Sequence, residues 1–187
     1  MLLAPFVIII RILRPVRLIR FGYFSVDRIG HLAFDVEIYL AQQSLGRQQT
    51  RTLDIFFLKG KESNLYLVQM VRRRICAHPI VQYLYRANDL IPFGEKHKLL
   101  PARETANSRD FTKTLNRTYP QMAFTDKDKL AGRWFFQKLG LKAEEKIVVL
   151  MVRDSAYLES LHQGRDWSYH DCRDTDINAY QEMSIEL

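Results

Sequence analysis

A chain of 187 residues, 47% of them hydrophobic, can bury one good core, or one domain and part of another. With only 8 glycines and 6 prolines, it is neither a low-complexity nor a fibrous protein. A formal net charge of +7 favours anionic partners such as a membrane surface, a nucleic acid or a phosphorylated small molecule.

The sequence contains no Walker, dinucleotide-binding, zinc-finger or RNA-binding motif. Cys76 and Cys172 are far apart and lack the spacing of metal ligands, and the five histidines are scattered. This pattern predicts a reduced, cytoplasmic protein without a structural metal.

The first 15 residues form a hydrophobic and basic N-terminal segment. Residues 1–10 are nearly all apolar, but Pro5 interrupts them, and a membrane-spanning helix needs about 20 apolar residues. Arginine then recurs at every third position, at Arg11, Arg14, Arg17 and Arg20. Such a stripe suits an anionic membrane, where each arginine contributes ~1 kcal/mol. A hydrophobic helix packed on its own domain fits equally well, and the sequence does not decide between the two.

Residues 16–46 predict the strand, loop and helix with which a Rossmann-like domain begins. The strand covers 16–21, and the helix ends at Gly46. Gly30 would let the backbone approach a ligand or a neighbouring strand, although a glycine there is more often needed for packing. The helix N-terminus, beside Arg28 and His31, would offer N–H groups to an anion. His31 is either a general base or a residue that caps the helix.

The middle of the chain predicts a strand over residues 53–58, a helix over 65–74 and a second helix over 80–91. Arg72, Arg73 and Arg74 end the first of these helices, where cations complement the helix dipole. They form either a solvated helix end or a contact for nucleic acid or lipid. Residues 93–117 are polar and predict a connecting loop.

Thr125 and Asp128 predict a capping box at the start of a helix that Gly140 ends. The apolar run at 147–152 then predicts a strand buried on both faces. Strands that alternate with helices predict parallel pairing and a doubly wound α/β architecture. A last helix begins at Asp176 and stops in mid-pattern at residue 187, so we expect a truncated chain.

A dense cluster of polar and aromatic side chains follows the predicted strand at 147–152. Its residues include Arg153, Asp154, Ser155, Tyr157, Arg165, Trp167, Tyr169, His170 and Arg173. Because ligands of open α/β sheets bind just outside the carboxyl ends of the strands, the cluster indicates an anion site. A solvated loop whose charges pair among themselves is the alternative.

Three sequence blocks resemble a bacterial family of predicted glycosyltransferases associated with surface-polysaccharide synthesis. The blocks are RIGHLA at 28–33 with Glu37 and Tyr39-Leu40, VRDSAYL at 152–158, and RDWSYHDCRDTDI at 165–177. The resemblance covers nearly all of the chain from about Leu13. The family is similar in turn to two-domain GT-B glycosyltransferases, and its strand-then-arginine block to the nucleotide-sugar motif of fucosyltransferases. This chain departs from the family pattern at Asp35, Val36 and Cys172.

The resemblance implies a truncated GT-B-like fold. Residues 16–145 would form the N-terminal Rossmann-like domain, and 146–187 the first βα unit of the nucleotide-sugar-binding domain. The implied activity is transfer of a sugar from a nucleotide-diphosphate donor to a glycan or lipid-linked glycan, without metal or cofactor. The fragment itself would be inactive. We expect no nucleic acid partner and a cytoplasmic location, with a peripheral contact to the anionic inner face of the membrane left open.

The resemblance also assigns roles to residues. Arg153 would hold the donor diphosphate, and the other donor-binding residues would be Ser155, Tyr157, Arg165, Tyr169, His170 and Arg173. Arg28, Gly30, His31 and Glu37 would line the acceptor cleft. His31 or Asp154 would deprotonate the acceptor, or Asp154 would orient Arg153. The alternative function is that of a non-catalytic basic module that binds a membrane surface or nucleic acid.

Overall fold

The computed structural model describes residues 3–46, 51–106, 109–142, 145–152, 156, 160, 164, 166 and 168–181. The chain divides into two compact units, residues 1–132 and 133–187. Each unit is described by itself. Among the described residues, no helix is both long enough and apolar enough to cross a membrane.

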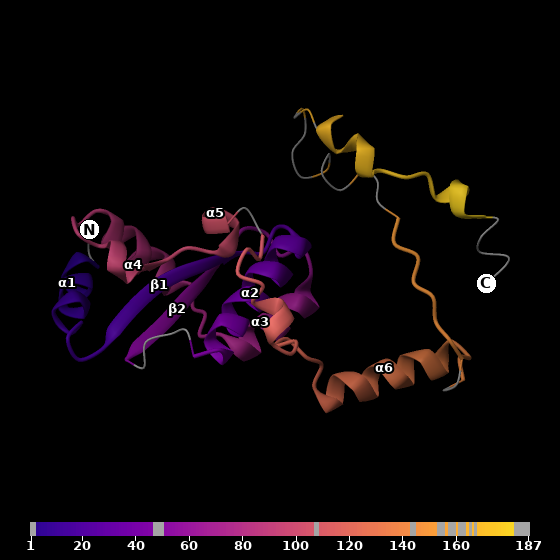
Figure 1. Cartoon of the computed structure of the whole chain (residues 1–187), viewed down its shortest axis with the longest axis horizontal. Helices are drawn as coiled ribbons and strands as arrows, with labels where there is room; N and C mark the ends of the chain where they lie inside the picture. The colour runs from indigo at the N-terminus through magenta and orange to yellow at the C-terminus, as the bar shows by residue number, and fades with distance from the viewer. Residues whose placement is uncertain are drawn as a thin grey trace. The chain divides into compact units, whose positions relative to one another are not determined.

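The first unit is built on a parallel sheet of the described strands in the order β2-β1-β3. Figure 1 shows β1 and β2 side by side. The central strand β1 (Leu18–Ser25) pairs with β2 (Thr52–Lys59) from Leu18↔Thr52 to Ser25↔Lys59. On its other side β1 pairs with the short strand β3 (Lys98–Leu99) through Phe21↔Lys98 and Gly22↔Leu99. The predicted α/β class with parallel pairing is confirmed.

Helices cover both faces of this sheet. On one face lie α2 (Ile29–Ser44) and α3 (Leu65–Arg74), which pack on Phe24, Val26 and Phe56. On the other lie α1 (Ala4–Ile12) and α4 (Ile80–Asp89), which pack on Phe21, Tyr23 and Phe57. Successive side chains of β1 and β2 therefore enter opposite cores, which explains why both strands read as nearly continuous apolar runs.

Close packing at the middle of β1 requires a glycine. A Cβ atom at Gly22 would lie 2.7 Å from the Phe56 ring and 3.1 Å from the Leu99 carbonyl oxygen. Such distances are too short for any larger residue, so Gly22 sets how closely β1 and β3 lie under the α2 face.

Local end signals place several helices where the sequence predicts them. Helix α3 spans the predicted residues, and the Asn64 side chain accepts a hydrogen bond from the Leu67 N–H at its start. Gly46 and Gly140 have positive φ values of 67° and 81°, as expected of glycines that follow a helix. The capping box is confirmed, because the Thr125 and Asp128 side chains accept hydrogen bonds from each other's N–H groups at the start of α6 (Asp126–Lys138).

The region 93–117 is more structured than the predicted loop. It contains η1 (Glu95–His97), β3, α5 (Ala102–Ala106) and η2 (Leu115–Arg117). Strand β3 is two residues long and is defined by its pairing with β1. It is too short to show the alternation of apolar and polar residues that would predict a strand. His97 directly precedes β3 and is buried. Its Nδ1 atom lies 2.7 Å from the Ile19 carbonyl oxygen.

In the second unit, the predicted buried strand at 147–152 is not formed. These residues have no regular secondary structure, and the apolar side chains of 147–151 are exposed, Val149 to 76% and Met151 to 88%. A strand needs a neighbour to hydrogen-bond its backbone, and no described strand pairs with this run. The later elements η3 (Ser168–Arg173) and η4 (Ile177–Tyr180) are short 3-10 helices, the second capped by Asp176.

Candidate functional site

The strand order creates a preferred place for a ligand. In doubly wound parallel sheets with the order 2-1-3, the strand order reverses between the first and third strands, and ligands bind outside the carboxyl ends of the strands at this switch point. Here, the switch point lies between β1 and β3, next to helix α2.

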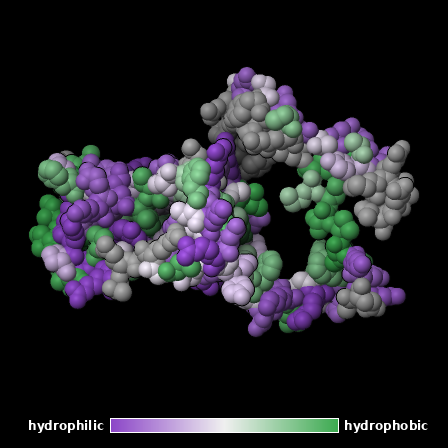
Figure 2. Space-filling model, viewed as in Figure 1, coloured by the Kyte–Doolittle hydropathy of each residue, from purple (hydrophilic) through white to green (hydrophobic). Residues whose placement is uncertain are grey.

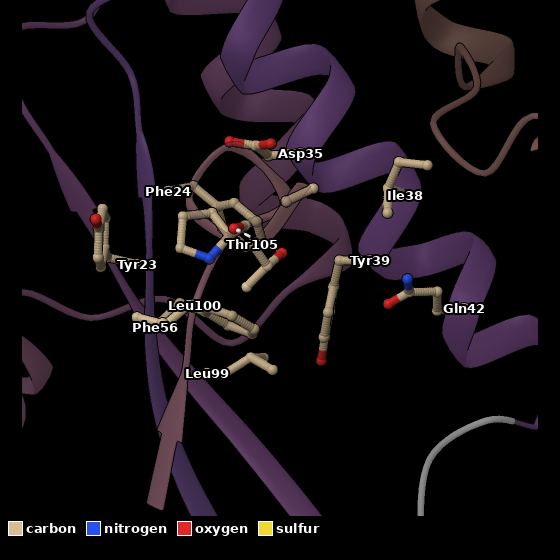
Figure 3. A pocket seen from close by; sticks show the side chains of 12 residues that line it. Tyr23, Phe24, Asp35, Ile38, Tyr39, Gln42, Phe56, Leu99, Leu100 and Thr105 are labelled. Carbon is tan, nitrogen blue, oxygen red and sulfur yellow. Dashed lines mark hydrogen bonds between the residues drawn. The ribbon is translucent and has the colours of Figure 1, made fainter. Parts of the chain in front are cut away.

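A pocket of about 390 Å³, including its open mouth, lies at this point (Figure 3). Its walls come from the end of β1, from α2, and from the segment that runs from β3 into α5. The lining residues are Tyr23, Phe24, Asp35, Ile38, Tyr39, Gln42, Phe56, Leu99, Leu100, Pro101, Ala102 and Thr105. The pocket therefore depends on β3 and α5, the elements that the sequence does not predict.

Polar side chains enter the pocket mainly from one face of α2. Asp35, Tyr39 and Gln42 are spaced by four and three residues, which places them on the same side of a helix. Figure 3 shows Asp35 toward one end of the pocket and Tyr39 with Gln42 toward the other. Asp35 is only 2% exposed, so its carboxyl group is held inside the protein next to the cavity. Thr105 faces them from α5.

One end of the α2 face is tied to the sheet by a buried ion pair. Arg20 donates two hydrogen bonds to the Asp54 carboxylate, at 2.7 and 2.9 Å. Tyr39 also donates its hydroxyl proton to Asp54, at 2.9 Å, and Gln43 donates to the Tyr39 hydroxyl. Because Arg20 holds the Asp54 carboxylate in place with two hydrogen bonds, the bond from the Tyr39 hydroxyl to Asp54 fixes the Tyr39 ring as a rigid wall of the pocket.

The predicted acceptor residues lie at or near the start of α2. Arg28 is the residue before the helix, Gly30 is in its first turn, and His31 stands one turn before Asp35 on the same face. A Cβ atom at Gly30 would meet nothing within 4 Å, so packing against a neighbouring strand is not the reason for this glycine. The space above the helix start is open to an incoming group.

Glu37, which we expected to line the acceptor cleft, makes contacts that hold the fold together. Its carboxylate accepts hydrogen bonds from the N–H groups of Gln121 and Met122, at 2.5 and 3.0 Å. It thereby fastens the 121–122 segment to α2.

The predicted donor residues lie largely beyond what the structure describes. Arg153, Asp154, Ser155, Tyr157, Arg165 and Trp167 are outside the described residues, as are the side chains of Tyr169, His170 and Arg173. In the same block, Asp166 accepts a hydrogen bond from the Ser168 N–H at 2.9 Å, and bonding to Ser168 lowers the pKa of its carboxyl group. The donor assignments stay predictions.

Sequence reasoning missed Asp35 and Thr105 as pocket residues. The spacing from His31 to Asp35, Tyr39 and Gln42 was a signal for a shared polar face of α2. For Thr105 the sequence offered no signal, because its position follows from the pairing of β3. No group of three or more metal-ligating side chains gathers among the described residues.

No protein-family model, curated protein or solved structure matches this chain.

Proposed function

We propose that this chain carries the acceptor-side domain and part of the donor site of a metal-independent glycosyltransferase. The donor would be a nucleotide-diphosphate sugar, and the acceptor a surface polysaccharide or a related, lipid-linked glycan. The observation that carries the proposal is the pocket at the carboxyl ends of β1 and β3, bordered by the α2 face that holds His31 and Asp35. The resemblance of the blocks at 28–33, 152–158 and 165–177 supplies the reaction class.

On the acceptor side, the reaction needs a base. The acceptor oxygen attacks the anomeric carbon, the bond from that carbon to the diphosphate oxygen breaks, and the hydroxyl proton passes to the base. His31 is our candidate for the base, because an imidazole accepts a proton near neutral pH. The Asp35 carboxylate, on the same face of α2, stabilises the imidazolium that results. Arg28 and the open helix start at Gly30 would hold an anionic part of the acceptor.

On the donor side, the reaction needs fixed positive charge. The departing diphosphate gains negative charge as the sugar becomes cationic, and an arginine contacts phosphate through two parallel hydrogen bonds. We assign this role to Arg153, helped by Arg165 and Arg173, with Asp154 either orienting Arg153 or acting as the base. Ser155, Tyr157, Tyr169 and His170 would contact the sugar or the nucleotide base.

The donor site can be tested by nucleotide binding. Titration calorimetry with a panel of nucleoside diphosphates should find one that binds, and Arg153→Ala should weaken that binding at least tenfold, because each charged hydrogen bond contributes about 1.5–3 kcal/mol. Arg133→Ala, in the same unit, is the matched control. Unchanged affinity in the Arg153 variant refutes the donor assignment.

Transfer itself tests the acceptor side. Where transfer to an acceptor is measurable, His31→Ala should lower kcat by about 100-fold or more and leave nucleotide affinity unchanged, the pattern expected of a general base. If His31→Ala leaves kcat unchanged, His31 is not the base, and another residue must accept the proton.

The second candidate is a basic, non-catalytic module that binds either nucleic acid or a membrane surface. Observations on helix α3 argue against nucleic acid. At the end of α3, Arg73 is paired with Asp128 at 2.7 Å and Arg72 with Glu62 at 3.4 Å. Because two arginines of this triplet already have acidic partners, it is a poor contact for nucleic acid. The version that involves a membrane has a specific observation in its favour, on helix α1.

A further inference from the structure

Helix α1 is turned so that its one charged side chain points inward with Val7 and Ile10, and its other large apolar side chains point outward. Ala4, Val7 and Arg11, spaced as one helix face, lie toward the protein, and Val7 is completely buried. The opposite face is formed entirely by apolar residues with large exposed fractions: Phe6 58%, Ile8 47%, Ile9 54%, Ile12 70% and Leu13 48%. In a helix that faced only water, this distribution would be reversed.

Arg11 holds the helix in this orientation. Its guanidinium donates to the Asn88 side-chain oxygen at 2.7 and 3.0 Å and to the carbonyl oxygens of Asn88, Ile91 and Pro92 at 2.6–2.9 Å. These acceptors lie at and beyond the end of α4, where helix carbonyls are left without intrahelical partners. The contact is close enough to exclude any side chain at Gly94, where a Cβ atom would collide with Arg11 and Asn88.

The exposed apolar surface extends past α1. Val16, in the turn that follows, is 72% exposed, and the segment that Arg11 binds adds Leu90 and Phe93, at 74% and 90%. Figure 2 shows hydrophobic residues gathered at the left end of the view, where Figure 1 places α1. We call the outward face of α1, with Val16, Leu90 and Phe93, the α1 surface.

The charge around the α1 surface is mainly positive, and the acidic residue two positions after Phe93 in sequence, Glu95, is followed by the exposed Lys96. Arg14 and Arg17 are exposed in the turn after α1 and flank Val16. The first acidic residue of the sequence is Asp27, so residues 1–26 carry arginines and no carboxylate side chain. The nearest acidic residue of α4, Asp89, is paired with Lys98 at 2.7 Å.

From this geometry we infer that the α1 surface is a docking site for an anionic lipid bilayer. The apolar side chains would enter the boundary between headgroups and acyl chains, while Arg14 and Arg17 contact lipid phosphates. A second copy of the chain would also cover the apolar face, but a two-fold contact brings each positive rim near that of its partner. A lipid surface supplies the opposite charge. The inference is independent of the proposed transferase activity.

Co-sedimentation of the full chain with lipid vesicles tests the site. We expect binding to vesicles of phosphatidylglycerol and phosphatidylcholine in equal parts, little binding to phosphatidylcholine alone, and release at high salt. Arg14→Gln with Arg17→Gln should lower the partition coefficient about 25-fold, at about fivefold for each arginine. Ile8→Ser with Ile12→Ser should lower it as well, with an unchanged melting temperature because both side chains lie on the surface.

Matched controls change the same residue types elsewhere. Arg74→Gln with Lys127→Gln removes two exposed charges, and Leu65→Ser removes an exposed leucine; neither should alter the partition coefficient. Equal binding to both kinds of vesicle, or full binding by either α1 variant, overturns the inference. So does a dimer in light scattering that Ile8→Ser with Ile12→Ser dissociates while vesicle binding persists, since the surface would then serve a second copy.

Discussion

At the scale of single residues, arginines that look alike in the sequence have different surroundings. Arg11 is bound by the end of α4 and Arg20 by Asp54, whereas Arg14 and Arg17 face solvent. The predicted stripe of four is therefore wrong as one continuous surface, because a helix that ends at Ile12 cannot keep all four positions on one side. The two exposed arginines are the ones that a charged surface can reach.

His97 is the residue whose titration should be visible in stability. Burial lowers the pKa of its imidazole, as do the charges of Arg11 and Arg14, although the hydrogen bond to the Ile19 carbonyl opposes them. The unfolded chain therefore takes up a proton at a higher pH than the folded chain. Stability is complete above the unfolded pKa, about 6.5, and falls as the pH drops from there toward the lower, folded pKa.

Urea unfolding above about pH 7 and near about pH 5.5 measures this effect. We expect the unfolding midpoint of the native chain to fall across this interval, and that of His97→Gln to fall less, because glutamine does not titrate. If both chains lose the same stability, His97 does not cause the change.

At the scale of elements, helix ends were predictable and the smallest strand was not. Asn64, Gly46 and the Thr125–Asp128 box act through neighbours in sequence, so their effect can be read locally. Strand β3 exists because Lys98 and Leu99 meet β1 far away in the chain, and the pocket residues beyond it follow the same contact. The apolar run at 147–152 is the opposite case. Its residues favour a strand, but it forms none, because no described strand pairs with it.

The capping box makes a testable contribution to α6. The pKa of the Asp128 carboxyl group lies well below its ordinary value, because the Thr125 hydroxyl, Arg73 and the Thr125 N–H all bond to it. Its stabilising effect is present above the unfolded pKa near 3.8 and is lost as the pH falls through the folded pKa. Thr125→Ala should cost about 1 kcal/mol of local helix stability, the usual effect of losing such a cap.

Hydrogen exchange at neutral pH can measure this loss in the first turn of α6. Thr125→Ser keeps the hydroxyl and should restore protection, which separates the hydrogen bond from a change in volume. Equal exchange rates in the alanine variant and the native chain would show that the box contributes nothing.

At the scale of the whole molecule, the hydrophobic cores belong to the first unit. Both clusters of buried residues, one under α2 and α3 and one under α1 and α4, lie before residue 124, whereas Ile147, Val148 and Val149 are exposed in the second unit. The predicted boundary at 145/146 and the function of the residues beyond it stay predictions. The fold of the first unit could be read from periodicity, but its pocket could not.

A chain that ends at residue 142 should therefore retain the cooperative unfolding of the sheet. We expect its thermal midpoint, followed by circular dichroism, to lie within a few degrees of that of the full chain, because no core residue is removed. It should also associate less, since five consecutive exposed apolar residues at 147–151 are removed with this part of the second unit. A midpoint lower by more than about 5 °C would show that residues 143–187 help to hold the sheet together.

The clamp on Arg11 has a consequence for how α1 would meet a bilayer. Many amphipathic segments are disordered in water and fold only on contact, so part of their binding free energy is spent on ordering. Here the helix is already folded, and five hydrogen bonds from the Arg11 guanidinium hold it with its apolar face outward. Landing on a lipid surface would thus be a rigid-body event, rapid and readily reversed.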